Sequence, residues 1–150
     1  GDAITRQFCG TSTKSETIGK KPDLEGEEIP EEIAPLPSEL VIRKTKASVF
    51  FGTPLAQCLR AMRVNSLLVT GTSTSGCIRA SVVEGFSHGF PCFVVEECTF
   101  DRFELSHLVS LFDMDWKYAD VISLQEALNY VARIESSKQK SGARAKMTSP

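Results

Sequence analysis

Cys77 is the residue in this chain whose type and position best suit chemistry. It lies in the run Thr70–Ala80, rich in small residues, where a short apolar segment gives way to a predicted helix. Unpaired backbone N–H groups and the positive end of the helix dipole favour the thiolate there, and the thiolate is the nucleophilic form of cysteine. The competing interpretation is a buried cysteine with a structural role. We expect a nucleophile.

Such a nucleophile needs a neighbouring base or cation, and the two histidines do not fit that role. A thiol that attacks a carbonyl also needs donors for the oxyanion that forms. His88 lies at the far end of the helix that Cys77 begins, about 16 Å away at 1.5 Å per residue. We expect His107 to satisfy a polar contact instead. A lysine or a carboxylate must then assist the thiol.

The lysine candidates are Lys44 and Lys46, which follow a predicted strand at Leu40–Ile42. Ligands of a parallel α/β sheet bind beyond the carboxyl ends of the strands. Lys44 and Cys77 both follow strands, so they can meet at that edge. A solvated lysine after an edge strand is the alternative.

The composition predicts a soluble globular protein and argues against two classes of partner. The chain has 150 residues, 41% hydrophobic content and a net charge of −2, so nothing favours nucleic acid. Its longest apolar runs are strand-sized, whereas a membrane helix needs about 20 apolar residues. Five cysteines, odd in number and without a C-x-x-C pair, suit a reducing compartment. We therefore expect a cytoplasmic protein that binds neither nucleic acid nor membrane.

The sequence divides into three parts of different composition. Residues 1–38 are polar and acidic, and only Ala3–Phe8 resembles a short strand. Residues 39–135 alternate strand-like and helix-like segments and form the predicted domain. Residues 136–150 are expected to form a disordered, solvated tail, whose basic side chains leave an anionic partner as a lesser alternative.

The alternation within residues 39–135 predicts the fold class. The expected strands are Leu40–Ile42, Leu67–Thr70, Phe93–Val95 and Val121–Ile122. The expected helices are Pro54–Arg63, Gly76–His88 and one that starts with a capping box at Ser123–Glu126, and Gly89 is the expected C-cap of the second. Continuous apolar strands separated by helices indicate a mostly parallel sheet covered on both faces. We predict a three-layer α-β-α, Rossmann-like α/β fold.

Several separated motifs resemble the isochorismatase-like cysteine hydrolase family. These motifs are Val41–Lys44, Ser48–Thr53 and Val69–Cys77. Two further stretches, Leu111–Asp115 and Lys117–Val121, are similar to the N-carbamoylsarcosine amidase branch of that family. The resemblance implies a hydrolase that cleaves amide or carbamoyl carbon–nitrogen bonds.

The resemblance also implies a role for each matching residue. Cys77 matches the nucleophile, which forms a thioester-type intermediate, and Lys44 matches the active-site lysine, whose charge favours the thiolate. The Thr72–Ser73 bond matches a cis peptide that turns backbone N–H groups inward. The N–H groups of Ser73 and Cys77 would then form the oxyanion hole.

The implied substrate is a small amide or carbamoyl compound with a carboxylate. Arg102 matches an arginine that resembles a carboxylate clamp, and Thr74 belongs to the same substrate-binding group. The related zinc enzymes need an Asp-x-His with a further histidine, which this chain does not offer, so we expect neither metal nor cofactor. Isochorismatase proper does not use the cysteine. Homo-oligomers are expected by analogy.

One part of the family pattern has no match in the sequence. The third catalytic residue of the family is an aspartate at the end of the first strand, in an Asp-x-Gln pattern, and neither Asp2 nor Asp23 fits it. We expect the chain to lack that strand through N-terminal truncation, which would expose sheet edges and lower stability. The alternative to an amidohydrolase is therefore an inactive domain that serves binding or oligomerisation.

Overall fold

The structure is a computed structural model that describes residues 29–147. Its contacts divide the chain into two units, Gly1–Val41 and Ile42–Pro150. The described part of the first unit contains a single short 3-10 turn, η2 (Glu31–Ile33). The predicted strand Ala3–Phe8, and Asp2 and Asp23, lie outside the described residues. Every element that follows belongs to the second unit.

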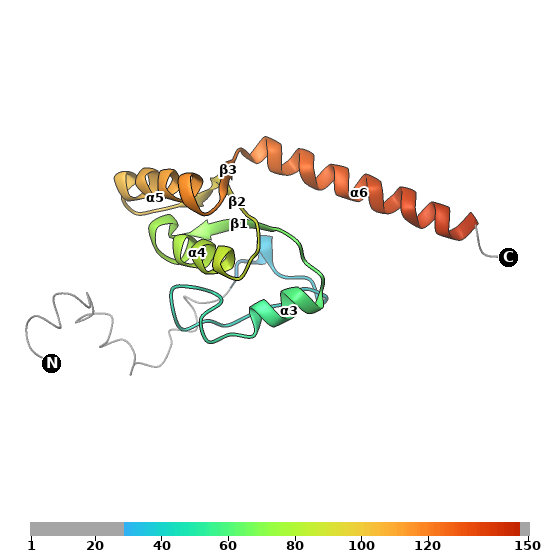
Figure 1. Cartoon of the computed structure of the whole chain (residues 1–150), viewed down its shortest axis with the longest axis horizontal. Coiled ribbons are helices and arrows are strands. Elements are labelled where there is room, and N and C mark those ends of the chain that lie inside the picture. The colour runs from blue at the N-terminus through green and yellow to red at the C-terminus, as the bar shows by residue number, and fades with distance from the viewer. Residues whose placement is uncertain (1–28, 148–150) are drawn as a thin grey trace, which may run out of the picture. The chain divides into compact units, whose positions relative to one another are not determined.

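The second unit is built on a parallel sheet (Figure 1). Its strands are β1 (Leu67–Thr72), β2 (Cys92–Phe100) and β3 (Asp120–Ile122), in the order β1-β2-β3. Leu67 pairs with Cys92, and Phe93 pairs with Asp120. Three of the four predicted strand segments, Leu67–Thr70, Phe93–Val95 and Val121–Ile122, belong to this sheet. The expectation of a parallel sheet is confirmed.

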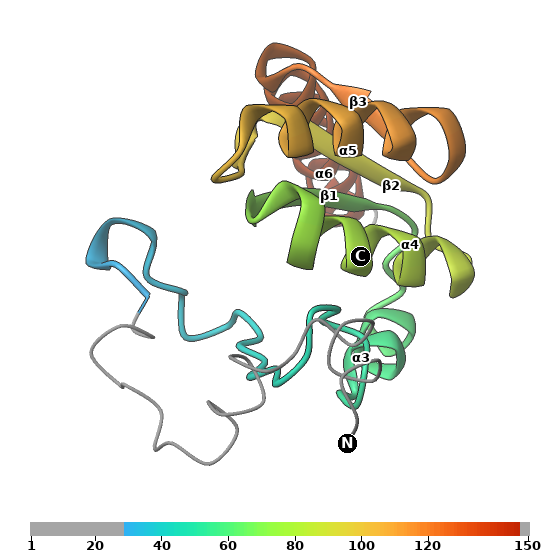
Figure 2. The same ribbon diagram turned by 90° about the vertical axis from the view of Figure 1, so that its left-hand side faces the viewer.

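Helices lie on both faces of the sheet. The helices are α3 (Leu55–Ala61), α4 (Arg79–Ser87), α5 (Glu104–Lys117) and α6 (Leu124–Met147), and a π-helical turn, η3 (Thr74–Ile78), leads into α4. Figure 2 shows α4 and α5 on one face and α6 on the other. This arrangement is the predicted α-β-α order of an α/β fold. None of the helices within residues 29–147 has the length and apolar character that crossing a membrane requires.

Two predicted helix ends are confirmed. Gly89 follows α4 with a φ of 85°, and its N–H donates to the carbonyl of Phe86 at 2.9 Å, as a left-handed cap requires. At the start of α6, the Ser123 N–H donates to Glu126 Oε2 at 2.9 Å, and the Glu126 N–H donates to Ser123 Oγ at 3.3 Å. The Ser123 N–H, with help from its hydroxyl, lowers the pKa of Glu126. These bonds satisfy donors that the helix itself leaves unpaired.

The main core lies between β2 and the helices α4 and α5. Its buried residues are Ile78, Val82, Cys92, Val94, Leu111 and Met114. Cys92 is 3% exposed, and burial raises the pKa of its thiol. Cys92 is therefore a buried cysteine with a structural role.

Two expectations about elements differ from the structure. Leu40–Ile42 forms no strand, and Leu40 and Val41 are exposed. A strand needs a neighbouring strand for its backbone bonds, and none of the strands in the described part of the chain pairs with this segment. The expected tail also differs, because α6 continues to Met147. The polar composition of this segment does not exclude a helix, because Ala, Lys, Gln and Arg all have a high helix propensity.

Candidate active site

The turn that follows β1, residues 73–78, is held by hydrogen bonds within its own backbone. The Thr72–Ser73 peptide bond is cis, at the position that the resemblance indicates. The N–H groups of Gly76 and Ile78 both donate to the Ser73 carbonyl, at 3.0 and 3.2 Å. A side chain at Gly76 would place its Cβ 2.6 Å from Ser73 Oγ. The turn thus holds Cys77 close behind the end of β1.

The structure brings Lys44 and Cys77 together. The Lys44 Nζ lies 3.3 Å from the Cys77 Sγ and also donates to the Lys46 carbonyl at 3.0 Å. Lys44 is exposed, whereas Cys77 is half-buried. At this distance the ammonium is in hydrogen-bonding contact with the sulfur. The geometry therefore suits a nucleophilic cysteine.

Lys44 reaches this position without the predicted strand because the segment after it is held against α4. The Val49 N–H donates to Ser81 Oγ at 3.0 Å. Phe50 is 6% exposed and packs beside Gly85, where an added Cβ would lie 3.2 Å from the Phe50 ring. One hydrogen bond and one buried ring thus fix the chain a few residues beyond Lys44.

Asp101, which directly follows β2, is hydrogen-bonded to the thiol turn. Both the N–H and the hydroxyl of Ser75 donate to Asp101 Oδ2, each at 2.6 Å. The Ser75 hydroxyl, followed by its N–H, lowers the pKa of Asp101 because both bonds favour the carboxylate. No pattern in the sequence indicated a role for Asp101. Its position directly after the strand that pairs with β1 is the signal that could have found it.

Replacing Asp101 by asparagine is expected to lower the Tm at pH 6. The folded pKa of Asp101 is depressed, so its contribution is present above its unfolded value of about 3.9 and is lost as the pH falls through the folded value. The Tm difference between wild type and Asp101→Asn should therefore shrink as the pH falls below the unfolded value towards pH 2.

Thermal unfolding followed by circular dichroism between pH 2 and 6 measures this difference. Asp120→Asn, the same change at an exposed position, is the control. A Tm difference for Asp101→Asn that stays constant over the whole range would contradict the assignment.

A hydrogen bond between Thr74 and His107 is a second contact that holds the thiol turn. Thr74 is fully buried, and its Oγ1 is hydrogen-bonded to His107 Nδ1 at 2.9 Å. The polar contact expected for His107 is therefore present. Thr74 was expected among the substrate-binding residues, but solvent does not reach its side chain. Its hydroxyl instead joins the turn to α5, and this pair is a further feature that the sequence did not reveal.

Neither Arg102 nor His88 forms a hydrogen bond with the Lys44–Cys77 pair in the described part of the chain. Arg102 is exposed in the loop between β2 and α5, where its N–H donates to Asp101 Oδ1 at 2.8 Å. Within residues 29–147, its guanidinium has no recorded hydrogen bond or ion pair. The His88 ring packs on Phe50, with the ring centroids 5.2 Å apart. Arg102 therefore directly follows a residue that bonds the thiol turn, but among the described residues no contact joins its side chain to Cys77.

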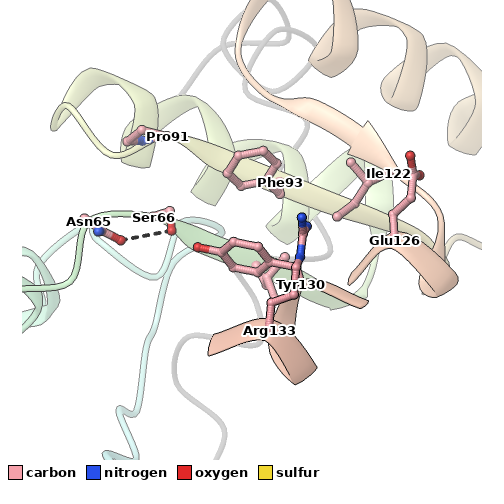
Figure 3. Close-up of a pocket in the computed structure, with 9 residues that line it drawn as sticks. Asn65, Ser66, Pro91, Phe93, Ile122, Glu126, Tyr130 and Arg133 are labelled. Carbon is pink, nitrogen blue, oxygen red and sulfur yellow. Dashed lines mark hydrogen bonds between the residues drawn. The ribbon is translucent and has the colours of Figure 1, made fainter. Parts of the chain in front are cut away.

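A separate cavity of about 470 Å³ lies on the other face of the sheet. Phe93, Ile122 and Tyr130 are among its lining residues (Figure 3). Successive strand residues point to opposite faces, so Phe93 faces this cavity while its neighbour Val94 lies in the core beside α4. The cavity does not include Cys77. Among the described residues, no group of three or more His, Cys, Asp or Glu side chains is placed to hold a metal ion.

The match to a known family covers most of the chain. The family model of the isochorismatase domain matches residues 7–126. The chain belongs to the isochorismatase family. This result confirms the resemblance drawn from the separated motifs, and the parallel sheet with helices on both faces agrees with it.

Relatives of the chain include two enzymes whose names describe the cleavage of an amide bond. Maleamate amidohydrolase from Pseudomonas putida is 45% identical over 104 residues, covering 69% of this chain and 49% of that protein. N-carbamoylsarcosine amidase from Arthrobacter sp. is 36% identical over 104 residues, covering 69% of this chain and 39% of that protein. The chain thus spans half the length, or less, of these curated relatives.

A solved structure supports the isochorismatase fold independently. A putative hydrolase of the isochorismatase family from Chromobacterium violaceum is 31% identical, with a TM-score of 0.68. The match covers 75% of this chain and 64% of that chain. This isochorismatase-family chain therefore shares its fold with a solved protein of the same family.

Proposed function

We propose that this protein hydrolyses an amide or carbamoyl carbon–nitrogen bond of a small molecule, with Cys77 as the nucleophile. The observation that carries the proposal is the 3.3 Å separation between Lys44 Nζ and Cys77 Sγ, in a turn just beyond β1. A thiol beside a cation at the end of a parallel strand has both the charge environment and the access that covalent catalysis needs.

The proposed reaction proceeds in two steps through a thioester. The Cys77 thiolate attacks the carbonyl carbon, the carbon–nitrogen bond breaks, and the nitrogen leaves as ammonia or an amine after taking up the proton that the thiol gave up. Water then attacks the thioester carbon, which releases the acid and returns the proton to the thiol. Each step is an acyl transfer, so the atoms and charges balance without an additional reactant.

Charge stabilisation in these steps is assigned to Lys44 and to backbone donors. The Lys44 ammonium stabilises the thiolate before attack. The N–H groups of Ser73 and Cys77 are proposed as the oxyanion hole, since those of Ser75, Gly76 and Ile78 are already engaged by Asp101 and by the Ser73 carbonyl. Donors fixed by the turn need no rearrangement when the negative charge develops.

The proposed substrate class is a small amide or carbamoyl compound with a carboxylate. Maleamate and N-carbamoylsarcosine appear in the names of the two relatives. Both compounds have a carboxylate besides the bond to be cleaved. Arg102 is the proposed carboxylate clamp, because an exposed guanidinium can bind a carboxylate through two parallel hydrogen bonds. The reaction is proposed to take place in the cytoplasm.

Ammonia release from maleamate and from N-carbamoyl amino acids tests the proposal. We expect turnover by the wild-type chain and a loss of at least about 10³-fold in Cys77→Ser, as for other enzymes whose nucleophile is removed. Cys58→Ser is the matched control and should keep the wild-type rate, because this cysteine lies in α3. Equal rates for wild type and Cys77→Ser, or a folded wild type without turnover, would contradict the proposal and favour a binding or oligomerisation role.

A further inference from the structure

A single carboxylate joins the thiol turn, residues 73–78, to the loop that leads into α5. Asp101 Oδ2 accepts hydrogen bonds from the N–H and the hydroxyl of Ser75, each at 2.6 Å. The other oxygen, Oδ1, accepts from the Arg102 N–H at 2.8 Å. Each oxygen of this carboxylate is therefore bonded to a different segment of the chain.

The bonds to Asp101 hold the thiol turn to another part of the fold. Ser75 lies two residues before Cys77 in the same π-helical turn, η3. The bonds that Gly76 and Ile78 donate to the Ser73 carbonyl only hold the turn to itself. The bonds from Ser75 reach the segment after β2, and hydrogen bonds to a carboxylate are about twice as strong as neutral ones. They therefore fix where the turn lies relative to the end of β2.

The charge of Asp101 does not by itself favour attack of the thiol on a carbonyl. Negative charge develops on the substrate oxygen in that step, and a nearby carboxylate opposes it by Coulomb repulsion. Removing the carboxylate would therefore speed up acylation if its charge were the dominant effect. Removing it would slow acylation if it acts by holding the turn in place. The two roles thus predict effects of opposite sign.

We propose that Asp101 is a positioning residue for the nucleophile and acts through Ser75. By fixing the thiol turn, it keeps the N–H groups of Ser73 and Cys77 where the substrate oxygen becomes negative. Donors of an oxyanion hole must lie about 2.7–3.1 Å from that oxygen, and a misplacement of about 1 Å can cost about 10²-fold in rate. This inference rests on the proposed function for the nucleophile and the oxyanion hole.

Two reactions of the same thiol separate positioning from general reactivity. In acylation by p-nitrophenyl acetate, a sulfur–carbon bond forms, the ester carbon–oxygen bond breaks and p-nitrophenolate leaves, so the carbonyl oxygen carries negative charge on the way. In alkylation by iodoacetamide, the sulfur displaces iodide and no oxyanion forms. The thiol proton goes to the solvent in both reactions. The acylation rate divided by the alkylation rate therefore measures how well the donors of the turn are placed.

Asp101→Ala is expected to slow the acylation of Cys77 by about 10- to 100-fold. Its alkylation should change by less than about 5-fold, because solvent screens the lost charge. Asp101→Asn keeps an acceptor oxygen without the charge, so its acylation rate should lie between those of wild type and Asp101→Ala. Asp120→Ala is the matched control and should keep both rates, because Asp120 begins β3 at the opposite end of the sheet.

The release of p-nitrophenolate, followed by absorbance, gives the acylation rate after subtraction of the rate for Cys77→Ser. Peptide mass spectrometry gives the alkylation rate of Cys77, and circular dichroism verifies that each variant is folded.

Ser75→Ala tests whether the effect of Asp101 passes through Ser75. This change removes one of the two bonds and keeps the carboxylate, so acylation should fall by less than in Asp101→Ala. The double variant Ser75→Ala, Asp101→Ala should react within about 2-fold of Asp101→Ala, because changes within one hydrogen-bond network are not additive. Should Asp101→Ala fail to fold, a decreased ratio of acylation to alkylation in Ser75→Ala supports the proposal and an unchanged ratio contradicts it.

Four results would overturn the role of Asp101. These are unchanged or faster acylation in Asp101→Ala, equal decreases in acylation and alkylation, effects of Ser75→Ala and Asp101→Ala that multiply, and a wild-type Cys77 that p-nitrophenyl acetate does not acylate. A wild type that is acylated at Cys77 but hydrolyses no amide would contradict the proposed function alone. The ratio of the two rates then still decides the role of Asp101.

Discussion

Replacing Lys44 by methionine is expected to slow the alkylation of Cys77 by iodoacetamide at pH 7 by about 2- to 5-fold. The attacking sulfur carries negative charge, and the Lys44 ammonium lies 3.3 Å from it. Lys44 is exposed, and an exposed pair of charges contributes about 0.2–1 kcal/mol, which sets the size of the expected decrease. Methionine keeps an unbranched apolar stem in place and removes only the charge. The rate of the proposed hydrolysis should fall by at least the same factor as the alkylation rate.

Peptide mass spectrometry of the alkylated chain measures this rate for each cysteine separately. Lys46→Met is the matched control, because it changes the neighbouring lysine and keeps the Lys46 carbonyl that accepts the Lys44 hydrogen bond. The half-buried Cys58 and Cys98 serve as internal standards in the same sample. An unchanged Cys77 rate in Lys44→Met, or an equal decrease in Lys46→Met, would show that the 3.3 Å contact does not activate the thiol.

Replacing Met114 by alanine is expected to cost about 2–5 kcal/mol of the free energy of unfolding. Met114 is fully buried in the core between β2, α4 and α5. Truncating a buried methionine loses the transfer free energy of the removed atoms and leaves a cavity. The cost is a large fraction of the roughly 5–15 kcal/mol that holds a typical domain together. Met114→Ala should therefore unfold at a much lower urea concentration than the wild type.

The same substitution at Met62 is the control, because this side chain is 61% exposed at the end of α3. We expect Met62→Ala to change the free energy of unfolding by less than about 0.5 kcal/mol. Urea denaturation followed by circular dichroism gives both values. Similar losses in the two variants, or no loss in Met114→Ala, would contradict the assignment of the core.

The sequence was most informative where a short stretch determines its own structure. The capping box at Ser123–Glu126 and the left-handed Gly89 depend on a few adjacent residues, and both are present as predicted. The apolar strand segments were also recognised, because strands buried on both faces form continuous apolar runs. Lys44 and Cys77 were paired by the resemblance of several motifs. Spacing alone left a solvated lysine as the alternative.

The remaining features depend on partners far away in the chain. The bonds from Ser75 to Asp101 and from Thr74 to His107 join residues 26 and 33 positions apart, and no local pattern encodes them. Helix α5 was not predicted either. Its apolar residues occur on two faces, so periodicity could not tell which face meets the sheet. The predicted strand Leu40–Ile42 has the right composition but no paired neighbour within the described residues.

The pairing of β1 with β2 is irregular between Val69 and Gly71, where the two strands contribute different numbers of residues. Val69 pairs with Val94 and Gly71 pairs with Thr99, so Thr70 alone on β1 stands against the four residues 95–98 on β2. Beyond this irregularity, Thr72 pairs with Phe100, and Asp101 follows directly. Local insertions of this kind redirect the side chains that come after them. The number of residues in the stretch 95–98 thus sets how far Asp101 lies beyond the last regular pair of the two strands.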